Sequence, residues 1–219
     1  MTTVAVMQPY FFPYAGYFRL FAAADLFVVY DCVQFPRRGF VHRNRLPDRS
    51  GRLDWLTLPL RKCRRDTVIE NLAFPADARS ELARRMCRFP GLDRLDLPEF
   101  EELRLALFAV EGRVVDYLDD LLGIAGGFLG MSTPRIRSSA LGLPADLRGA
   151  DRILEICRLT GARRYVNAPG GRGLYDHDEF RRRGVELRFL PAWNGPDDSM
   201  LHRLLTEPHN LLARDLTAM

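Results

Sequence analysis

The first 30 residues combine apolar runs and polar breaks in an order that predicts a strand, a loop, a helix and a second strand. Residues 3–7 form a short apolar run, and Pro9 and Pro13 then impose extended or turning backbone. Residues 16–24 follow a helical pattern, whereas residues 26–30 are continuously apolar, as in a strand covered on both faces. We therefore expect a βαβ unit with two parallel strands.

The hydrophobic pattern changes in the middle of the chain. Strands are predicted at 55–60 and, more briefly, near 67–69. Apolar residues then recur at helical spacing over 78–89 and 99–122. These helices predict a helical insertion at about 76–130.

Strands and helices alternate again in the last third of the chain. The predicted elements are a strand at 135–137, a helix at 151–160, a strand at 163–166, a helix at 178–183 and a strand at 185–190. Such alternation favours an α/β fold with a mainly parallel sheet and flanking helices. We expect residues 1–219 to form a single domain of this kind.

The composition is that of a globular chain, with 47% apolar and 27% charged residues. No apolar stretch approaches the roughly 20 residues that span a bilayer. The first residues lead directly into a predicted strand and lack the basic and apolar segments of an export signal. We expect a cytoplasmic protein without a membrane partner.

The four cysteines, Cys32, Cys63, Cys87 and Cys157, are far apart and form no C-x-x-C pair. Reduced thiols are expected, and no metal site is expected because zinc ligands usually come in closely spaced pairs. Cys32 follows an acidic residue, whereas reactive cysteines usually need a cationic environment. A nucleophilic role for Cys32 is therefore not expected unless nearby arginines reverse that balance.

The net charge of +4 and the pI of about 9.1 raise the question of nucleic-acid binding. Nearly all of the positive charge is arginine, and Lys62 is the only lysine. Basic runs at 61–65 and 181–183 are more often solvated faces than phosphate tracks, and no RRM, KH or helix-turn-helix signature accompanies them. We do not expect nucleic acid as a partner, since that would require one continuous basic face.

Ligands of open α/β sheets bind beyond the carboxyl ends of the strands, so the loops at those ends hold the candidate site. The loop after the first predicted strand carries one amide and a dense set of aromatic residues over 8–17. Aromatic residues in a loop often serve packing, which leaves packing and binding about equally open. From this loop we select Gln8, Tyr10 and Tyr17 as substrate-binding candidates.

Asp31 ends the second predicted strand. A carboxylate at the end of an apolar strand is costly unless it is paired, hydrogen-bonded or functional. A structural ion pair with a nearby arginine is one reading, and a catalytic acid or base, or an anchor for an amine, is the other. We select Asp31 as a catalytic candidate.

Arginine, histidine and amide residues follow Asp31 in the same loop. Guanidinium groups suit planar anions, so the arginines could clamp a phosphate or a carboxylate. A histidine beside arginines is structural as often as catalytic, so His42 is a candidate base with a structural alternative. The substrate-binding candidates here are Gln34, Arg38, Arg43 and Asn44, which we expect to share one cleft with Gln8 and Asp31.

A third loop follows the strand predicted at 163–166 and is rich in glycine. Its glycines allow close approach of the backbone to a ligand and expose amides to an anion. Gly170, Gly171 and Tyr175 are the candidates from this loop.

The chain resembles the WbqC-like family. The densest motif residues are Met7-Gln8-Pro9-Tyr10, Gly16-Tyr17-Phe18, Asp31, Val33-Gln34-Phe35, Arg38 and Arg43-Asn44-Arg45. The later ones are Trp55-Leu56-Thr57, Arg137-Ser138-Ser139, Gly161-Ala162, Tyr165, Gly170-Gly171, Tyr175-Asp176 and Gly184-Val185. Two positions depart from the family's pattern, Cys32 and His202. The resemblance implies small-molecule biosynthesis in surface-polysaccharide (O-antigen) or natural-product pathways.

Two functions are compatible with these residues. The first is an enzyme, a group transferase or ligase-like catalyst that acts on an amino sugar or amino-acid derivative. The second is a non-catalytic binding or assembly factor of such a pathway, which docks a ligand or a pathway protein with the same loops. An anionic or amino-bearing small molecule is the expected partner in both. The sequence assigns no cofactor, because it has no P-loop or dinucleotide fingerprint.

Overall fold

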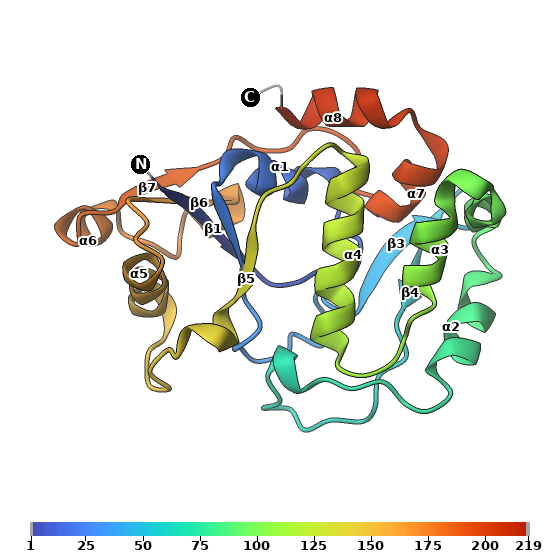
Figure 1. Cartoon of the computed structure of the whole chain (residues 1–219), viewed down its shortest axis with the longest axis horizontal. Coiled ribbons are helices and arrows are strands. Elements are labelled where there is room, and N and C mark those ends of the chain that lie inside the picture. Colours follow the sequence, from blue (N-terminus) through green and yellow to red (C-terminus); the bar gives the residue numbers. More distant parts are fainter. Residues whose placement is uncertain (1, 218–219) are drawn as a thin grey trace.

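Five parallel strands form the central sheet of the computed structural model, which describes residues 2–217 (Figure 1). The predicted α/β class with a mainly parallel sheet is confirmed. The strands, in their spatial order, are β5 (Arg135–Arg137), β2 (Leu26–Val29), β1 (Thr3–Met7), β6 (Arg164–Asn167) and β7 (Glu186–Phe189).

The central strand β1 pairs with β2 on one side and with β6 on the other, so that Ala5 lies opposite both Phe27 and Val166. The chain runs outward from β1 to β2 and β5, and then returns across the sheet to β6 and β7. The strand order therefore reverses between β1 and β6. In open parallel sheets a ligand crevice forms at such a reversal, beyond the carboxyl ends of the strands.

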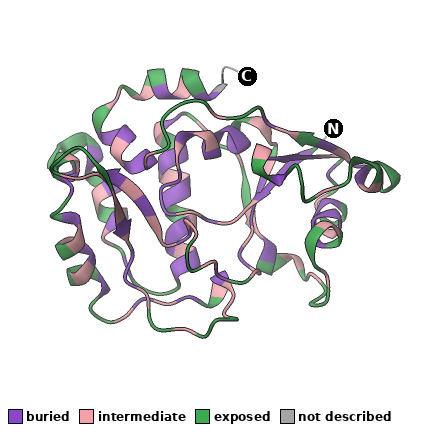
Figure 2. Ribbon diagram, turned by 180° about the vertical axis from the view of Figure 1, so that it is seen from behind, coloured by how far each residue is buried: buried purple, intermediate pink, exposed green. Residues whose placement is uncertain are grey.

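Two hydrophobic layers cover the sheet because successive side chains of a strand point to opposite faces. Ala5 and Phe27 pack in one layer with residues of α1 and α4, whereas Val4 and Val28 pack in the other with residues of α5 and α6. The inner strands β1, β2 and β6 are largely buried, and Figure 2 shows α6 as largely exposed. The helices concerned are α1 (Ala15–Ala23), α4 (Val114–Phe128), α5 (Gly149–Leu159) and α6 (His177–Arg182).

Helices occupy the segment between β4 (Leu53–Thr57) and β5, where a helical insertion is predicted. Besides α4, they are α2 (Ala78–Met86), η2 (Pro90–Asp96), η3 (Pro98–Phe100) and α3 (Glu101–Leu107). The helical spacing over 99–122 corresponds to two helices, because the chain breaks between α3 and α4. Gly112 adopts a φ of 66° in that break, a left-handed conformation that glycine tolerates best.

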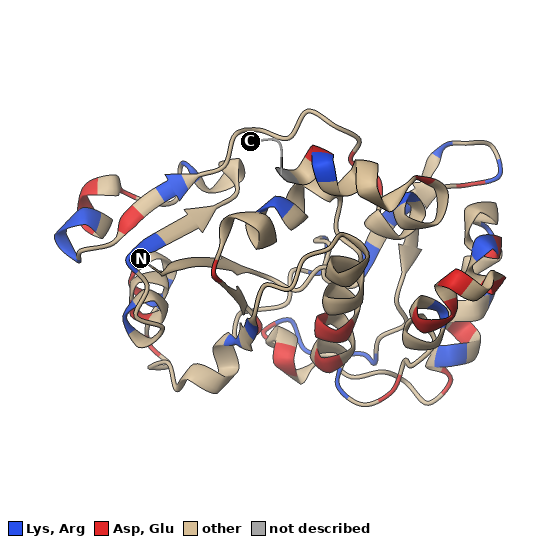
Figure 3. Cartoon of the chain, turned by 45° about the horizontal axis from the view of Figure 1, so that its top comes forward, with Lys and Arg blue, Asp and Glu red and all other residues tan. Residues whose placement is uncertain are grey.

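Ion pairs connect α4 to the edge strand β5. Arg135 Nε lies 2.6 Å from Asp119 Oδ1, and Arg137 pairs with Asp116. Figure 3 shows these acidic positions of α4 beside the basic positions of β5. The contacts fix the carboxyl end of β5, from which the chain enters η4 (Ser138–Leu141) and one wall of the site.

The structure also contains elements that the hydrophobic pattern does not predict. An antiparallel hairpin joins β3 (Arg43–Pro47) to β4 (Leu53–Thr57), although residues 43–47 read as a loop. The strand predicted near 67–69 is instead a single bridge from Gln34 to Val68, followed by η1 (Ile69–Asn71). Two further helices are α7 (Met200–Thr206) and α8 (His209–Thr217).

Candidate functional site

A cavity of about 490 Å³ opens at the carboxyl ends of β1 and β6, at the reversal of strand order. Six of the seven tyrosines in the chain line it, and we call it the tyrosine pocket. The lining tyrosines are Tyr10, Tyr14, Tyr17, Tyr30, Tyr165 and Tyr175. The other lining residues are Val6, Met7, Gln8, Leu20, Phe40, Ile153, Asn167, Ala168, Pro169, Gly170, Gly171 and Leu174.

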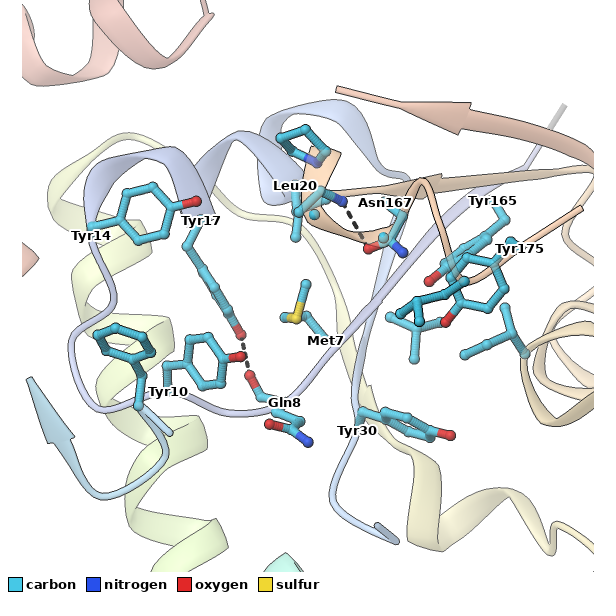
Figure 4. Close-up of a pocket in the computed structure, with 18 residues that line it drawn as sticks. Met7, Gln8, Tyr10, Tyr14, Tyr17, Leu20, Tyr30, Tyr165, Asn167 and Tyr175 are labelled. Carbon is cyan, nitrogen blue, oxygen red and sulfur yellow. Dashed lines mark hydrogen bonds between the residues drawn. The ribbon is translucent and has the colours of Figure 1, made fainter. Parts of the chain in front are cut away.

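One wall of the tyrosine pocket comes from the aromatic loop and α1 (Figure 4). The Tyr17 hydroxyl donates a hydrogen bond of 2.8 Å to the backbone oxygen of Gln8. The Tyr10 ring lies between Tyr17 and Phe40, with centroid distances of 5.4 and 5.7 Å. The buried Tyr17 ring therefore holds the backbone of this loop, and Gln8 and Tyr10 reach the cavity from that backbone.

The opposite wall consists of Tyr165 on β6 and Tyr175 in the glycine-rich loop, as Figure 4 shows. Their rings meet edge to face with centroids 5.8 Å apart, and the two phenol groups interact electrostatically. Tyr165 also stacks on Phe180 of α6. This packing fixes the position of the Tyr175 ring, which is only half-buried.

Asn167 brings an amide to the floor of the pocket from the last position of β6. Its Oδ1 accepts a hydrogen bond of 2.8 Å from the backbone nitrogen of Ala168. A β-carbon on Gly171 would lie 2.3 Å from Asn167 Nδ2, far inside contact distance. Glycine at 171 therefore makes room for the amide, whereas a β-carbon on Gly170 would meet nothing within 4 Å.

The tyrosine pocket is electrically neutral, since none of its lining residues is an acid, an arginine, a lysine or a histidine. Burial raises the pKa of Tyr10, Tyr17 and Tyr165 above the ordinary value for a phenol. The hydroxyl groups are therefore protonated at neutral pH. They can donate and accept hydrogen bonds, but they supply no negative charge.

A second cavity, of about 640 Å³, lies beside the first, beyond the end of β2. We call it the arginine pocket after Arg152, which reaches it from the first turn of α5. Its other lining residues are Cys32, Val33, Gln34, Asp66, Val68, Glu70, Ser138, Ser139, Gly142, Leu143, Pro144, Ala145 and Arg148.

Tyr30 and Arg152 form the boundary between the two pockets. Tyr30 lines the tyrosine pocket, and its hydroxyl lies close enough to the guanidinium group of Arg152 for the two to interact electrostatically. Burial raises the pKa of Tyr30, and the positive charge of Arg152 partly opposes that shift. Arg152 Nη1 also lies 3.5 Å from the backbone oxygen of Cys32 and 4.0 Å from its Sγ.

Asp31 lies beneath the arginine pocket and is completely buried. Its carboxylate accepts hydrogen bonds of 2.8 and 2.7 Å from the hydroxyls of Ser138 and Ser139, and one of 2.9 Å from the Ser139 backbone nitrogen. No arginine pairs with it among the residues that the structure describes. Asp31 thus joins the end of β2 to the end of β5, and its catalytic role stays a prediction.

Arg43 and Asn44 use their polar groups within the protein. The Arg43 guanidinium lies 4.2 Å above the Trp55 ring and donates to the backbone oxygens of Gly39 and Arg38. Asn44 is 1% exposed and donates to the backbone oxygens of Phe11 and Phe12. These contacts hold the aromatic loop in place, so both residues support the tyrosine pocket from behind its wall.

His42 lies outside both pockets, in a shallow hollow that Arg37 and Lys62 also line. Its ring meets the edge of Phe35 at a centroid distance of 5.0 Å. Burial, reinforced by the charges of Arg43 and Arg85, lowers the pKa of His42 to about 4. The imidazole is therefore neutral at physiological pH.

The predicted site residues are distributed over three places rather than one cleft. The tyrosine pocket receives Gln8, Tyr10, Tyr17, Gly170, Gly171 and Tyr175. Gln34 lines the arginine pocket, where its amide donates to the backbone oxygen of Arg65. Arg38, His42, Arg43 and Asn44 lie elsewhere, because the segment after Asp31 turns away from the sheet into β3.

The pocket-lining residues that sequence reasoning missed include Tyr14, Tyr30, Asn167, Arg152 and Glu70. Asn167 directly follows Val166 at a strand end, the same position that identified Gln8. Arg152 shares an apolar helix face with Ile156, four residues later, and both are buried. An arginine on the core-facing stripe of a helix is the signal that could have revealed it.

No group of three or more histidine, cysteine or acidic residues is placed to hold a metal ion within residues 2–217. Over the same residues, no helix has both the length and the apolar character that crossing a membrane requires.

The model of the WbqC-like protein family matches residues 8–196, and the chain therefore belongs to this family. Membership suggests a role in a biosynthetic pathway. The chain is also similar to the uncharacterized protein Rv1507c of Mycobacterium tuberculosis. The two are 28% identical over 193 residues, which cover 87% of this chain and 82% of that protein. No solved structure matches the chain significantly.

Proposed function

We propose that the chain is a biosynthetic enzyme, a small-molecule group transferase that acts on an amino sugar or amino-acid derivative held in the tyrosine pocket. The gathering of six tyrosines around one neutral cavity at the sheet reversal carries this proposal. A volume of about 490 Å³ suits a small metabolite.

The chemistry of the lining favours a polar, amine-bearing ligand without a negative charge. Tyrosine rings offer flat faces for the carbon–hydrogen surface of a sugar, and their negative faces attract an ammonium group. The hydroxyls of Tyr10 and Tyr175, with the amides of Gln8 and Asn167, can hydrogen-bond to sugar hydroxyls. A phosphate or free carboxylate finds no counterion in this lining.

A non-catalytic binding or assembly factor of the same pathway is the second candidate. One observation favours it: the carboxylate of Asp31 is fully engaged with Ser138 and Ser139 and lines neither pocket. The tyrosine pocket itself contains no acid or base that ionises near neutral pH. An enzyme of this design would act mainly by positioning two reactants.

Binding of three sugar probes tests the ligand class. Glucosamine, N-acetylglucosamine and glucose are titrated while tyrosine fluorescence is recorded. Glucosamine should bind more tightly than glucose, by about fivefold or more, through its ammonium group. Equal binding of glucose and glucosamine, or binding of neither, would contradict the proposed ligand class.

Turnover separates the enzyme from the binding factor. Extract is prepared from cells that lack the gene, and the purified protein is added in a small molar amount relative to the metabolite that accumulates there. Consumption of many equivalents of that metabolite is expected. Consumption that stops at one equivalent per protein chain would support the binding factor instead.

A further inference from the structure

The arginine pocket holds a buried positive charge that forms no ion pair with a carboxylate. Arg152 is 8% exposed, and its Nε has no hydrogen-bond partner in the structure. It interacts with the Tyr30 side chain and with the backbone oxygen and sulfur of Cys32, and it forms no ion pair among residues 2–217. A buried guanidinium in this state favours binding of an anion.

The other buried arginines have different surroundings. Arg203 is 4% exposed and forms a two-point ion pair with Glu207. Arg19 also has an unpartnered Nε, but it donates to the backbone oxygen of Pro191 and lines neither pocket. Arg152 alone of these three lines a cavity large enough for a ligand.

An acidic residue lines the same cavity. Glu70 is half-buried in η1, and it forms no ion pair among the residues that the structure describes. The second acid, Asp66, is already paired with Arg64, and both are exposed. The arginine pocket therefore presents a buried cation, Arg152, and an unpaired carboxylate, Glu70, on different elements of the fold. Arg148 also lines the pocket, but it is exposed and donates to the backbone oxygens of Ala145 and Leu147.

We propose that the arginine pocket binds the α-amino and α-carboxylate groups of an amino acid, with the carboxylate on Arg152 and the ammonium on Glu70. The guanidinium group presents paired donors that match a carboxylate. The α5 backbone begins beside Arg152 and adds partial positive charge on the same side. The volume of about 640 Å³ accommodates an amino acid together with its side chain.

This pocket adjoins the tyrosine pocket where the side chains of Tyr30 and Arg152 interact. The proposal that this pocket holds a second substrate rests on the group transfer proposed above. The proposal that it binds an amino acid does not depend on that function. An amino acid on Arg152 would lie next to a ligand that contacts Tyr30. The two pockets thus provide adjacent sites for two reactants.

The test begins with the twenty L-amino acids as probes, titrated one at a time by calorimetry. The tightest binder is then compared with its analogue that lacks the amino group, with its amide, and with inorganic phosphate. Each analogue should bind at least about tenfold more weakly, since each loses a charge-assisted contact. Phosphate or the des-amino analogue binding as tightly as the amino acid would overturn the zwitterion in favour of a simple anion site.

The location of binding is read from cysteine alkylation. Cys32 lines the arginine pocket, whereas Cys63 and Cys87 do not. The bound amino acid should slow alkylation of Cys32 by iodoacetamide and leave the other two unchanged, as measured by peptide mass spectrometry. Binding without protection of Cys32 would place the amino acid elsewhere and overturn the proposal.

Charge-removing variants complete the test. Arg152→Gln and Glu70→Gln should each weaken amino-acid binding by about tenfold. The matched controls are Arg19→Gln, at a buried arginine, and Glu111→Gln, at an exposed glutamate, both outside the arginine pocket. Both should leave amino-acid binding unchanged. Glu70→Gln does not remove a fully buried group, so its result decides the proposal even if Arg152→Gln fails to fold. Unchanged binding in a folded Glu70→Gln protein would overturn the assigned role of Glu70.

The result is independent of the tyrosine pocket. Gly171→Ala alters the floor of that pocket and should leave amino-acid binding in the arginine pocket intact. In the unaltered protein, absence of sugar binding together with amino-acid binding would refute only the proposed function, and sugar binding without amino-acid binding would refute only this inference.

Discussion

The tyrosine and arginine pockets share one edge of the sheet, but the tyrosine pocket is uncharged whereas the arginine pocket is lined by charged side chains. The tyrosine pocket is lined by phenols and amides, and burial keeps its hydroxyls protonated. The arginine pocket contains charged groups on both sides, with Arg152 buried and Glu70 half-buried. The difference shows how a single parallel sheet can offer neighbouring sites to a neutral or amine-bearing group and to a zwitterion.

The two pockets are also supported differently. Aromatic packing and two backbone contacts from Asn44 hold the tyrosine pocket. A buried carboxylate, Asp31, organises one wall of the arginine pocket. Removing the charge of Asp31 should therefore damage the arginine pocket, whereas adding a methyl group at Gly171 should damage the tyrosine pocket.

The largest effect is expected from Asp31→Asn. The neutral amide would replace one accepting oxygen with an NH2 group and remove the negative charge that strengthens the bonds from the Ser138 and Ser139 hydroxyls. We expect the free energy of unfolding to fall by about 3 kcal/mol, measured by urea denaturation. Asp66→Asn, an exposed change in the same pocket, is the control and should have little effect. Equal stability of Asp31→Asn and the unaltered protein would contradict the structural role of Asp31.

The pH dependence of stability should reflect His42, which lies outside both pockets. Its pKa is lowered to about 4, so between about pH 6.5 and 4 the unfolded chain binds a proton that the folded chain does not. Stability is therefore lost as the pH falls through this range. His42→Leu should reduce that loss by about 1–2 kcal/mol, after allowance for partial solvent exposure. Identical pH profiles for both proteins would contradict the burial effect.

Gly171→Ala should impair the tyrosine pocket selectively. The added β-carbon would displace the Asn167 amide and weaken its bond to Ala168. Glucosamine binding should weaken by about tenfold, a loss of about 1.4 kcal/mol. Gly170→Ala is the matched control in the same turn, since its β-carbon meets nothing within 4 Å. Similar behaviour of the two variants would refute the role of the Asn167 amide.

The smallest effect is expected from Tyr175→Phe, which removes a hydroxyl that interacts electrostatically with Tyr165. The stability should fall by about 1 kcal/mol or less in a denaturation experiment. Tyr14→Phe provides the comparison, because Tyr14 lies on the opposite wall of the pocket from Tyr165 (Figure 4). A larger loss in Tyr14→Phe than in Tyr175→Phe would reverse this assignment.

The sheet could be predicted from sequence because its strands are covered on both faces. Continuous apolar runs such as 26–30 have few other uses in a globular chain. The strand at 43–47 was not predictable in this way, since Arg43, Asn44 and Arg45 carry polar groups whose partners lie far away in sequence. Asn44 bonds to Phe12, and Arg45 pairs with Asp197.

The candidate site was predictable to the extent that it lies at strand ends. Gln8 and Tyr10 follow β1, and Gly171 and Tyr175 follow β6, so the switch-point rule brings them together. The same rule fails for the segment after Asp31. The direction in which a loop leaves the sheet depends on tertiary contacts, here the hairpin partner Trp55 stacked on Arg43.

The account depends most on the claim that the tyrosine pocket binds the ligand, and tyrosine-selective NMR tests this claim directly. Six of the seven tyrosines line the pocket, whereas Tyr117 is buried in α4 and bonds to the backbone oxygen of Leu107. Titration with glucosamine should shift signals of pocket tyrosines and leave the Tyr117 signal in place. A titration in which no pocket tyrosine responds, or in which Tyr117 shifts as much as they do, would contradict the account.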